Sequence, residues 1–272
     1  MPTWIVTPPW SHLSFQILGG KRDRYGAKWA GNSVVSSDFS RLYLLEEGTA
    51  VVTTRRGPVE LRPGQFYLFP AGQTAHYHCP REMILLWVHF RLEAVPLLDV
   101  FTRYDPPSAA AAPTGALDRF ELLLNTMGST RPGAALNSVG ILADFLQPFM
   151  PERWDAILPQ PDKLERLQPA LRTIQSEMSQ DLNLRQLADQ VHLHPTYFSN
   201  LFREVFGIAP KRYLTELRIR RAKALLLASD RSIAEVAREC GFDDPFYFSR
   251  LFRRHVGIAP RAFHRAGGVL GP

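Results

Sequence analysis

The sequence contains few cysteines and no long apolar run. Cys79 and Cys240 are the only two cysteines in 272 residues, and they lie far apart. Such a low number excludes a disulfide framework and is typical of a reducing cytoplasm. The longest apolar stretch, ILLWV at 84–88, has the length of a strand, far below the roughly 18 residues of a membrane span. The start of the chain also lacks the features of a secretory signal, so we expect a cytoplasmic protein with no membrane partner.

Motifs for catalysis and metal binding are also missing. The sequence has no P-loop, dinucleotide-binding or nucleophile motif. His76, His78 and His89 are the candidate metal ligands, and the first two share one face of an expected strand. No carboxylate stands at a matching spacing. We therefore expect no metal and no cofactor, and we expect these histidines to fill the protein interior or its rim.

Positive charge is concentrated at one end of the chain. Residues 1–161 contain 14 Lys and Arg against 14 Asp and Glu, whereas residues 162–272 contain 18 against 12. The whole net charge of +6 therefore lies in the second part. Such asymmetry favours a nucleic-acid or other anionic partner, although it also occurs as a solubility feature.

Short apolar runs alternate with turn residues in the first half of the chain. The runs are LYLL (42–45), AVVTT (50–54), VEL (59–61), QFYLFP (65–70), AHYH (75–78) and MILLWVHF (83–90). Many short strands separated by Pro and Gly turns predict an all-β barrel or sandwich.

A proline-rich break and two helices are expected next. The stretch DPPSAAAAPTG (105–115) contains three prolines, which exclude a strand and disfavour a helix, so we predict a linker or exposed loop. Helical patterns follow at 117–127 and 135–150. In the second pattern the predicted apolar stripe is Leu136, Val139, Leu142, Ala143, Leu146 and Phe149. We expect this stripe to pack on the strands, on a partner subunit, or on both, before a second boundary at 151–161.

The last hundred residues contain an internal repeat. LFREVFGIAPKRY (201–213) returns as LFRRHVGIAPRAF (251–263), and Tyr-Phe-Ser precedes each copy, at 197–199 and 247–249. So many matches in the same order indicate two copies of one supersecondary unit.

Local rules predict the same structure for each copy. In the first, Asn183 and Gln186 form a capping box, Pro195 begins a second helix and Gly207 ends it. Its expected buried stripe is Phe198, Leu201, Phe202 and Val205. In the second copy Ser232 with Glu235, Gly241, Asp244 and Pro245 take the corresponding places. Its expected buried stripe is Phe248, Leu251, Phe252 and His255.

This arrangement, a short helix, a turn and a longer helix, is a helix-turn-helix. A helix from Pro210 to Leu227 is expected to join the two copies. Its eighteen residues span about 27 Å, which would place the second helices about one DNA turn, roughly 34 Å, apart.

The side chains outside the buried stripes define an expected DNA-facing surface. Asn pairs with adenine, Arg with guanine, and an aromatic ring contacts the thymine methyl. The expected base contacts are Thr196, Ser199, Asn200, Phe246, Ser249 and Arg250. The expected phosphate contacts are Arg203, Arg253 and Arg254. For Phe246, a place in the core is the alternative.

The second copy resembles a known family. Its motif is Gly241-Phe242-x-Asp244-x-x-Tyr247-Phe248-Ser249-Arg250-x-Phe252-Arg253, followed by Gly257 and Pro260. With the first copy it resembles the AraC/XylS family of bacterial transcription regulators over residues 165–265. The resemblance implies two helix-turn-helix units that both enter the major groove of double-stranded DNA. It also implies a cupin-like ligand-sensing and dimerisation domain in the first half, where residues 62–77 and WVHF (87–90) are similar to sugar-responsive members.

The sequence departs from this pattern at two places. The first recognition helix begins His194-Pro195 where the family commonly has a Ser cap, and His is a poor N-cap. The strands around 48–54 lack the His-x-His pair of metal-binding cupins.

The predicted fold is therefore α+β with two domains. Residues 1–105 form a cupin-like β-barrel with flanking helices, and residues 106–161 form the linker and helices of a dimerisation region. Residues 162–272 form an all-α double helix-turn-helix domain.

The first domain contains a candidate ligand site at Tyr77, Trp87 and His89. Trp87 and His89 share one face of a strand. Aromatic faces with a few hydrogen-bonding groups suit a polar, non-ionic ligand, and the family's sugar pockets use positions that resemble Tyr77 and Trp87. The alternative is that all three are ordinary core residues.

The expected function is DNA-binding transcription regulation in the bacterial nucleoid. We expect a homodimer with a small effector, such as a sugar, and contact with RNA polymerase if the protein is an activator. Two alternatives stay open: a metal-dependent cupin enzyme with a helical appendage, and a regulator without a small ligand.

Overall fold

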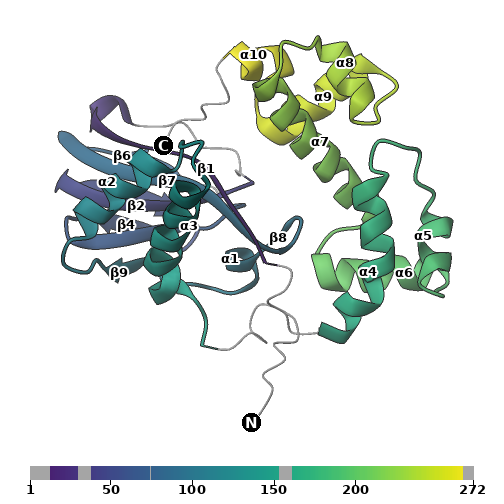
Figure 1. Cartoon of the computed structure of the whole chain (residues 1–272), viewed down its shortest axis with the longest axis horizontal. Coiled ribbons are helices and arrows are strands. Elements are labelled where there is room, and N and C mark those ends of the chain that lie inside the picture. Colours follow the sequence, from purple (N-terminus) through teal and green to yellow (C-terminus); the bar gives the residue numbers. More distant parts are fainter. Residues whose placement is uncertain (1–12, 30–37, 74, 153–160, 266–272) are drawn as a thin grey trace. The chain divides into compact units, whose positions relative to one another are not determined.

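The chain divides into two compact units, residues 1–158 and 159–272 (Figure 1). This computed structural model describes residues 13–29, 38–73, 75–152 and 161–265. Within these ranges every helix is too short or too polar to cross a bilayer. Cys79 and Cys240 are both free and buried.

Two antiparallel sheets form the first unit. The larger sheet has the order β1-β7-β2-β5-β9, with β8 paired to β7, and the smaller has the order β4-β3-β6. The strands are β1 (Ser14–Gly26), β2 (Ser40–Gly48), β3 (Ala50–Thr54), β4 (Gly57–Leu61), β5 (Gln65–Phe69), β6 (His76–His78), β7 (Glu82–Val95), β8 (Leu98–Asp99) and β9 (Ala109–Ala111). All six predicted strands are therefore confirmed, and β1 joins them as a long strand that the sequence did not reveal.

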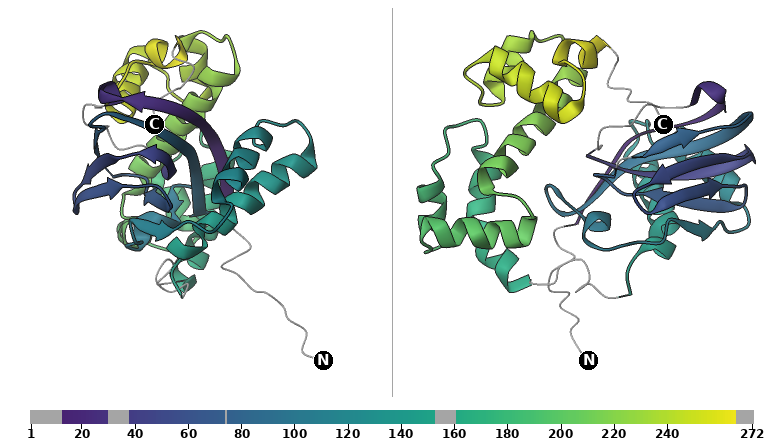
Figure 2. Two further views of the ribbon diagram at one scale, coloured as in Figure 1. Left: turned by 90° about the vertical axis from the view of Figure 1, so that its left-hand side faces the viewer. Right: turned by 180° about the vertical axis from the view of Figure 1, so that it is seen from behind.

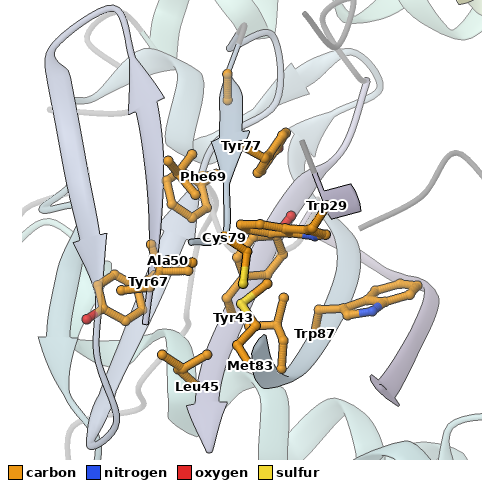
Figure 3. Packing of buried hydrophobic residues seen from close by; sticks show 14 residues of the cluster. Trp29, Tyr43, Leu45, Ala50, Tyr67, Phe69, Tyr77, Cys79, Met83 and Trp87 are labelled. Carbon is orange, nitrogen blue, oxygen red and sulfur yellow. The ribbon is translucent and has the colours of Figure 1, made fainter. Parts of the chain in front are cut away.

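The two faces of the larger sheet pack against different neighbours. Tyr43, Tyr67 and Phe69 face a core that also contains residues of the smaller sheet (Figure 3). On the opposite face, the Phe66 ring packs on Phe145 of α3, with ring centroids 4.6 Å apart. Strand β7 is buried on both faces, which explains its continuous apolar run.

Helices α1 (Val100–Arg103), α2 (Ala116–Thr126) and α3 (Pro132–Leu146) complete this unit, with short 3-10 turns at Ala27–Trp29 and Gln147–Phe149. Figure 2 shows α2 and α3 side by side against the larger sheet. The predicted stripe of the second helix was only partly correct, because Leu142, Leu146 and Phe149 are buried as expected but other predicted members are not. Leu136 is 73% exposed and Ala143 is exposed, whereas Ile141 and Phe145 are buried. The sheet selects the face with the larger side chains, which the i, i+3, i+4 spacing alone did not distinguish.

The prediction that residues 105–115 contain no strand was also wrong. Ala109–Ala111 pairs with the Gln65–Tyr67 part of β5 as the last strand of the larger sheet. Three residues between prolines are enough, because an edge strand uses only one side of its backbone for pairing.

Two of the three histidines do not fill the interior. His76 and His78 on β6 are exposed, and Tyr77 between them is buried. Strand alternation requires this arrangement once Tyr77 faces the core. His89 is buried, as expected.

The second unit is entirely helical in the residues described. Its helices are α4 (Pro161–Ser176), α5 (Leu184–Gln190), α6 (Pro195–Phe206), α7 (Pro210–Ala228), α8 (Ile233–Glu239), α9 (Pro245–Val256) and α10 (Pro260–Arg265). Helices α5–α6 and α8–α9 are the two predicted helix-turn-helix units, and α7 joins them (Figure 1). The sequence analysis did not specify α4 and α10, which add further buried side chains such as Leu167 and Phe263.

Most of the predicted caps and stripes explain why these helices form where they do. The expected box of Asn183 and Gln186 is only half present: Asn183 caps α5 by accepting from the Arg185 N–H at 2.9 Å. Ser232 and Glu235 make a complete capping box, and Asp244 accepts a hydrogen bond from the Phe246 N–H at 2.8 Å. His194 caps α6 through Nδ1, which accepts from the Thr196 N–H at 3.4 Å. The predicted stripes of α6 and α9 are buried apart from His255, which is half-buried.

Candidate nucleic-acid interface and ligand site

Helix α6 presents a polar face to solvent. Thr196, Asn200 and Arg203 are exposed, as the sequence predicted for a DNA-facing surface. The Asn200 side-chain oxygen accepts a hydrogen bond from Arg203 Nη1 at 3.5 Å. Ser199 is half-buried, and its hydroxyl donates to the Pro195 carbonyl at 2.9 Å. Its donor is therefore already used within the helix.

Helix α9 presents the equivalent face to solvent, with Phe246 in place of Thr196 and Arg250 in place of Asn200. Phe246 is 78% exposed, which removes the alternative that it is a core residue. Arg250, Arg253 and Arg254 are also exposed. Ser249 is half-buried, and its hydroxyl donates to the Pro245 carbonyl at 2.9 Å, as in the first copy. The assignment of bases and phosphates to these side chains remains a prediction.

The sequence analysis missed one residue on each face. Tyr197 is 52% exposed and Tyr247 is 49% exposed, at equivalent positions of the repeat. The Arg166 guanidinium lies 5.9 Å from the centre of the Tyr197 ring. The signal was present, because both copies keep a Tyr outside the buried stripe.

The three predicted ligand-site residues lie in the interior of the first unit. Trp87 and His89 are neighbours on one face of β7, with ring centroids 4.4 Å apart. Tyr77 on β6 packs on Trp29, at a centroid distance of 5.0 Å. The indole N–H of Trp87 donates to the Tyr25 hydroxyl at 2.9 Å.

The structure adds Arg41 and Tyr43 to this group. Both lie on β2, where Arg41 stands opposite His89 and Tyr43 opposite Trp87 on β7. Arg41 is only 1% exposed. The sequence analysis missed it because one Arg at the start of an apolar run gives no sign of burial.

Several buried polar atoms of this group have no hydrogen-bond partner among the residues described. They are Trp29 Nε1, Arg41 Nε and Nη1, and His89 Nε2. Native interiors rarely leave such atoms unsatisfied. Figure 3 shows Trp29, Tyr43 and Tyr77 converging on one region between the two sheets. The cluster therefore has the hydrogen-bonding capacity that a polar ligand requires.

Burial controls the protonation of these residues. Burial, and then the positive charge of Arg41, lower the pKa of His89 to about 3. Burial, and then Tyr77, raise the pKa of Tyr43 well above its usual value. Near neutral pH the His89 imidazole and the Tyr43 phenol are therefore both neutral. In the described ranges, no three His, Cys, Asp or Glu residues are grouped as metal ligands.

Two helix-turn-helix units with exposed polar and basic faces, joined in one chain to a strand-rich unit with a polar interior, define a DNA-binding regulator with a ligand-binding domain. Comparison with known proteins agrees. The model of the AraC-like ligand binding domain matches residues 36–146, and that of a helix-turn-helix domain matches residues 187–266.

Two curated relatives are similar over most of the chain. The arabinose operon regulatory protein of Escherichia coli (strain K12) is 31% identical over 214 residues, which are 75% of this chain and 72% of the relative. The transcriptional activator RhaS of Yersinia pestis (strain Pestoides F) is 24% identical over 217 residues, with coverages of 76% and 80%. The chain therefore belongs to the AraC family of transcription regulators. Both relatives are named as transcription regulators.

A solved structure shows the same two-unit fold. ToxT from Vibrio cholerae O395, bound to (E)-4-(8-methylnaphthalen-1-yl)but-3-enoic acid, has a TM-score of 0.56 and covers 93% of this chain and 99% of its own. Its sequence identity is 14%, so this likeness concerns the fold alone.

Proposed function

We propose that α6 and α9 enter neighbouring segments of the major groove and that their exposed faces determine the operator sequence. Thr196, Ser199 and Asn200 supply the base contacts of the first helix, and Phe246, Ser249 and Arg250 those of the second. Arg203, Arg253 and Arg254 bind phosphates. The observation that supports this assignment is the repeated exposure of equivalent positions on two helices with the same buried stripe.

We propose further that the first unit binds a small hydroxylated effector of the sugar class. Aromatic rings from Tyr77 and Trp87 provide apolar faces, while Arg41, Tyr43 and His89 supply donors and acceptors. The supporting observation is the convergence of buried, unpartnered polar atoms on one interior region. The name of the Escherichia coli relative, an arabinose operon regulatory protein, agrees with this ligand class.

A second ligand class is a small carboxylate, such as a sugar acid. It is favoured by Arg41, which is 1% exposed and has two unpartnered nitrogen atoms, Nε and Nη1. A carboxylate oxygen accepts a strong hydrogen bond from such a donor and cancels the charge of the guanidinium.

The remaining assignments concern partners and cellular place. We propose a homodimer that uses α2 and α3, because Leu122 is 46% and Leu136 is 73% exposed on these helices. The protein acts at the bacterial nucleoid and contacts RNA polymerase as an activator, as the name of RhaS suggests for that relative.

The test is a thermal unfolding screen of the full chain against neutral sugars, sugar acids and divalent metals, with operator DNA obtained by selection from random sequences. A ligand at 100 times its dissociation constant adds about 2.7 kcal/mol to stability. Stabilisation by one sugar, with a change in operator affinity, supports the proposal. Stabilisation by a sugar acid alone favours a carboxylate effector. Stabilisation by a metal alone favours the metal-dependent cupin enzyme. If no ligand changes stability, the regulator without a small ligand is favoured.

A further inference from the structure

Arg218, in the middle of α7, forms hydrogen bonds with the loop that leads into the first helix-turn-helix unit and with the turn inside the second. Its Nε donates to the Met178 carbonyl at 2.6 Å and its Nη2 to the Gln180 carbonyl at 2.7 Å. Both acceptors lie in the loop that joins α4 to α5. Its Nη1 donates to the Gly241 carbonyl, in the turn between α8 and α9, at 2.8 Å. The guanidinium also lies 5.6 Å from the centre of the Phe242 ring in that same turn.

The loop and the turn also approach each other directly. Gly241 has a positive φ of 79°, and a Cβ atom placed there would lie 2.6 Å from the Ser179 carbonyl oxygen. Burial lowers the pKa of Arg218, while the charges of Asp181 and Asp243 act in the opposite direction. The loop and the turn each supply one of these carboxylates, so both carry negative charge toward the same cation.

We propose that Arg218 is a positioning residue that fixes the spacing and angle between α6 and α9, so that both recognition helices dock on DNA together. The inference rests on the proposed two-helix contact with DNA. Helix α7 packs on the first helix-turn-helix unit through Tyr213, whose ring lies 5.2 Å from that of Phe202, and on the second through Ile219 in the shared core. The hydrogen bonds of Arg218 add a polar tie between the loop before α5 and the turn before α9. Three hydrogen bonds from one planar guanidinium restrict the relative motion of the two helix-turn-helix units before DNA is bound, and binding then costs less ordering entropy.

The test uses the full chain, a selected operator and two further duplexes. In each of these duplexes, the half contacted by one recognition helix is replaced with an unrelated sequence. Arg218→Lys and Arg218→Gln remove the planar fork, and the Lys variant keeps the charge. We expect both variants to lose about tenfold or more in affinity for the complete operator, the gain that linked binding gives. Affinity for each half-operator should stay unchanged, because each recognition helix is intact.

Arg212→Gln is the matched control on the same helix. Arg212 is exposed, and its Nε pairs at 2.9 Å with Glu216 on the same helix, so it connects no two units. This variant should keep the wild-type ratio of complete to half-operator affinity.

A second readout is the tolerance of operator spacing. One base pair inserted between the halves turns the second half by about 35°. The wild type should lose affinity strongly on this DNA, whereas the Arg218 variants should lose less, since their units can adjust. A merely destabilised protein would not gain this tolerance.

Three outcomes would overturn the inference. Equal losses on complete and half-operators would show a general folding defect, and an unchanged ratio in the Arg218 variants would show that α7 alone sets the geometry. If the wild type binds a half-operator as well as the complete one, the two-helix contact itself fails, and the role of Arg218 with it.

Discussion

Arg41 and His89 stand directly opposite each other on the neighbouring strands β2 and β7, in the interior of the first unit. Arg41 is 1% and His89 is 6% exposed. Burial, and then the neighbouring guanidinium, lower the pKa of the His89 imidazole to about 3. The pair therefore makes the stability of this unit depend on pH.

The first prediction concerns the pH dependence of stability. The pKa of His89 is about 3 in the folded state and about 6.5 when unfolded. Below pH 6.5 His89 takes up a proton in the unfolded chain but not in the folded one. The contribution of neutral His89 to the free energy of unfolding is therefore fully present above pH 6.5 and is lost as the pH falls toward 3. From pH 7 to pH 5, His89 should lower the free energy of unfolding of the wild type by about 2 kcal/mol. The His89→Gln variant should lack this loss.

Urea unfolding of the wild type and the variant at both pH values gives this difference. Burial raises the pKa of Asp99 to about 7, so Asp99 makes the free energy of unfolding rise as the pH falls. This opposite effect is the same in both proteins, because both contain Asp99. Trp87→Phe is the control, since it changes the same site without removing a titrating group. An identical slope in wild type and His89→Gln would contradict the expected neutral imidazole.

The second prediction concerns Arg41. Arg41→Met should raise the free energy of unfolding without ligand by about 1–3 kcal/mol, because it removes a buried group with unsatisfied donors. The same variant should lose the stabilisation by the effector. Arg24→Met is the control: Arg24 is exposed on β1 and pairs with Glu82 at 3.2 Å. Full effector stabilisation in the Arg41 variant would place the ligand elsewhere.

The third prediction compares two glycines with similar backbone angles. Gly207 and Gly241 have φ values of 74° and 79°, which cost a residue with a Cβ atom about 1–2 kcal/mol. A Cβ atom has open space at Gly207 but meets Ser179 at Gly241. Gly241→Ala should therefore destabilise the protein clearly more than Gly207→Ala in chemical unfolding. Equal effects would mean that the loop around Ser179 moves aside easily.

The fourth prediction separates base contacts from phosphate contacts on α9. Arg250→Ala should cost about 1–3 kcal/mol on the selected operator and relax the preference at one base pair. Arg254→Ala should weaken binding to all sequences and reduce the salt slope by about one unit. Binding titrations at several salt concentrations on specific and random DNA measure both quantities. If Arg250→Ala weakens all sequences equally, Arg250 contacts a phosphate instead.

Much of the second unit follows from local chemistry. Each cap, turn glycine and apolar stripe lies within one short segment, and the two copies confirm each other. Asp244 therefore begins α9 and Gly207 ends α6 where the sequence predicts. The exposed faces of α6 and α9 follow directly from the buried stripes.

The first unit was predictable only in part, because its contacts join distant segments. The strands were visible as apolar runs, yet the pairing of Ala109–Ala111 with β5 and the phase of α3 depend on the finished sheet. The histidines of β6 point outward because Tyr77 occupies the core.

The sequence alone determined the double helix-turn-helix and the exposed faces of α6 and α9, since caps, turns and buried stripes depend on residues close to each other along the chain. Only the tertiary structure showed that Arg41 is buried opposite His89 and that Arg218 ties the α4–α5 loop to the turn between α8 and α9. Both arginines look like ordinary surface charges in the sequence. Their roles come from strands and loops that approach them across long stretches of chain, and only folding creates that proximity.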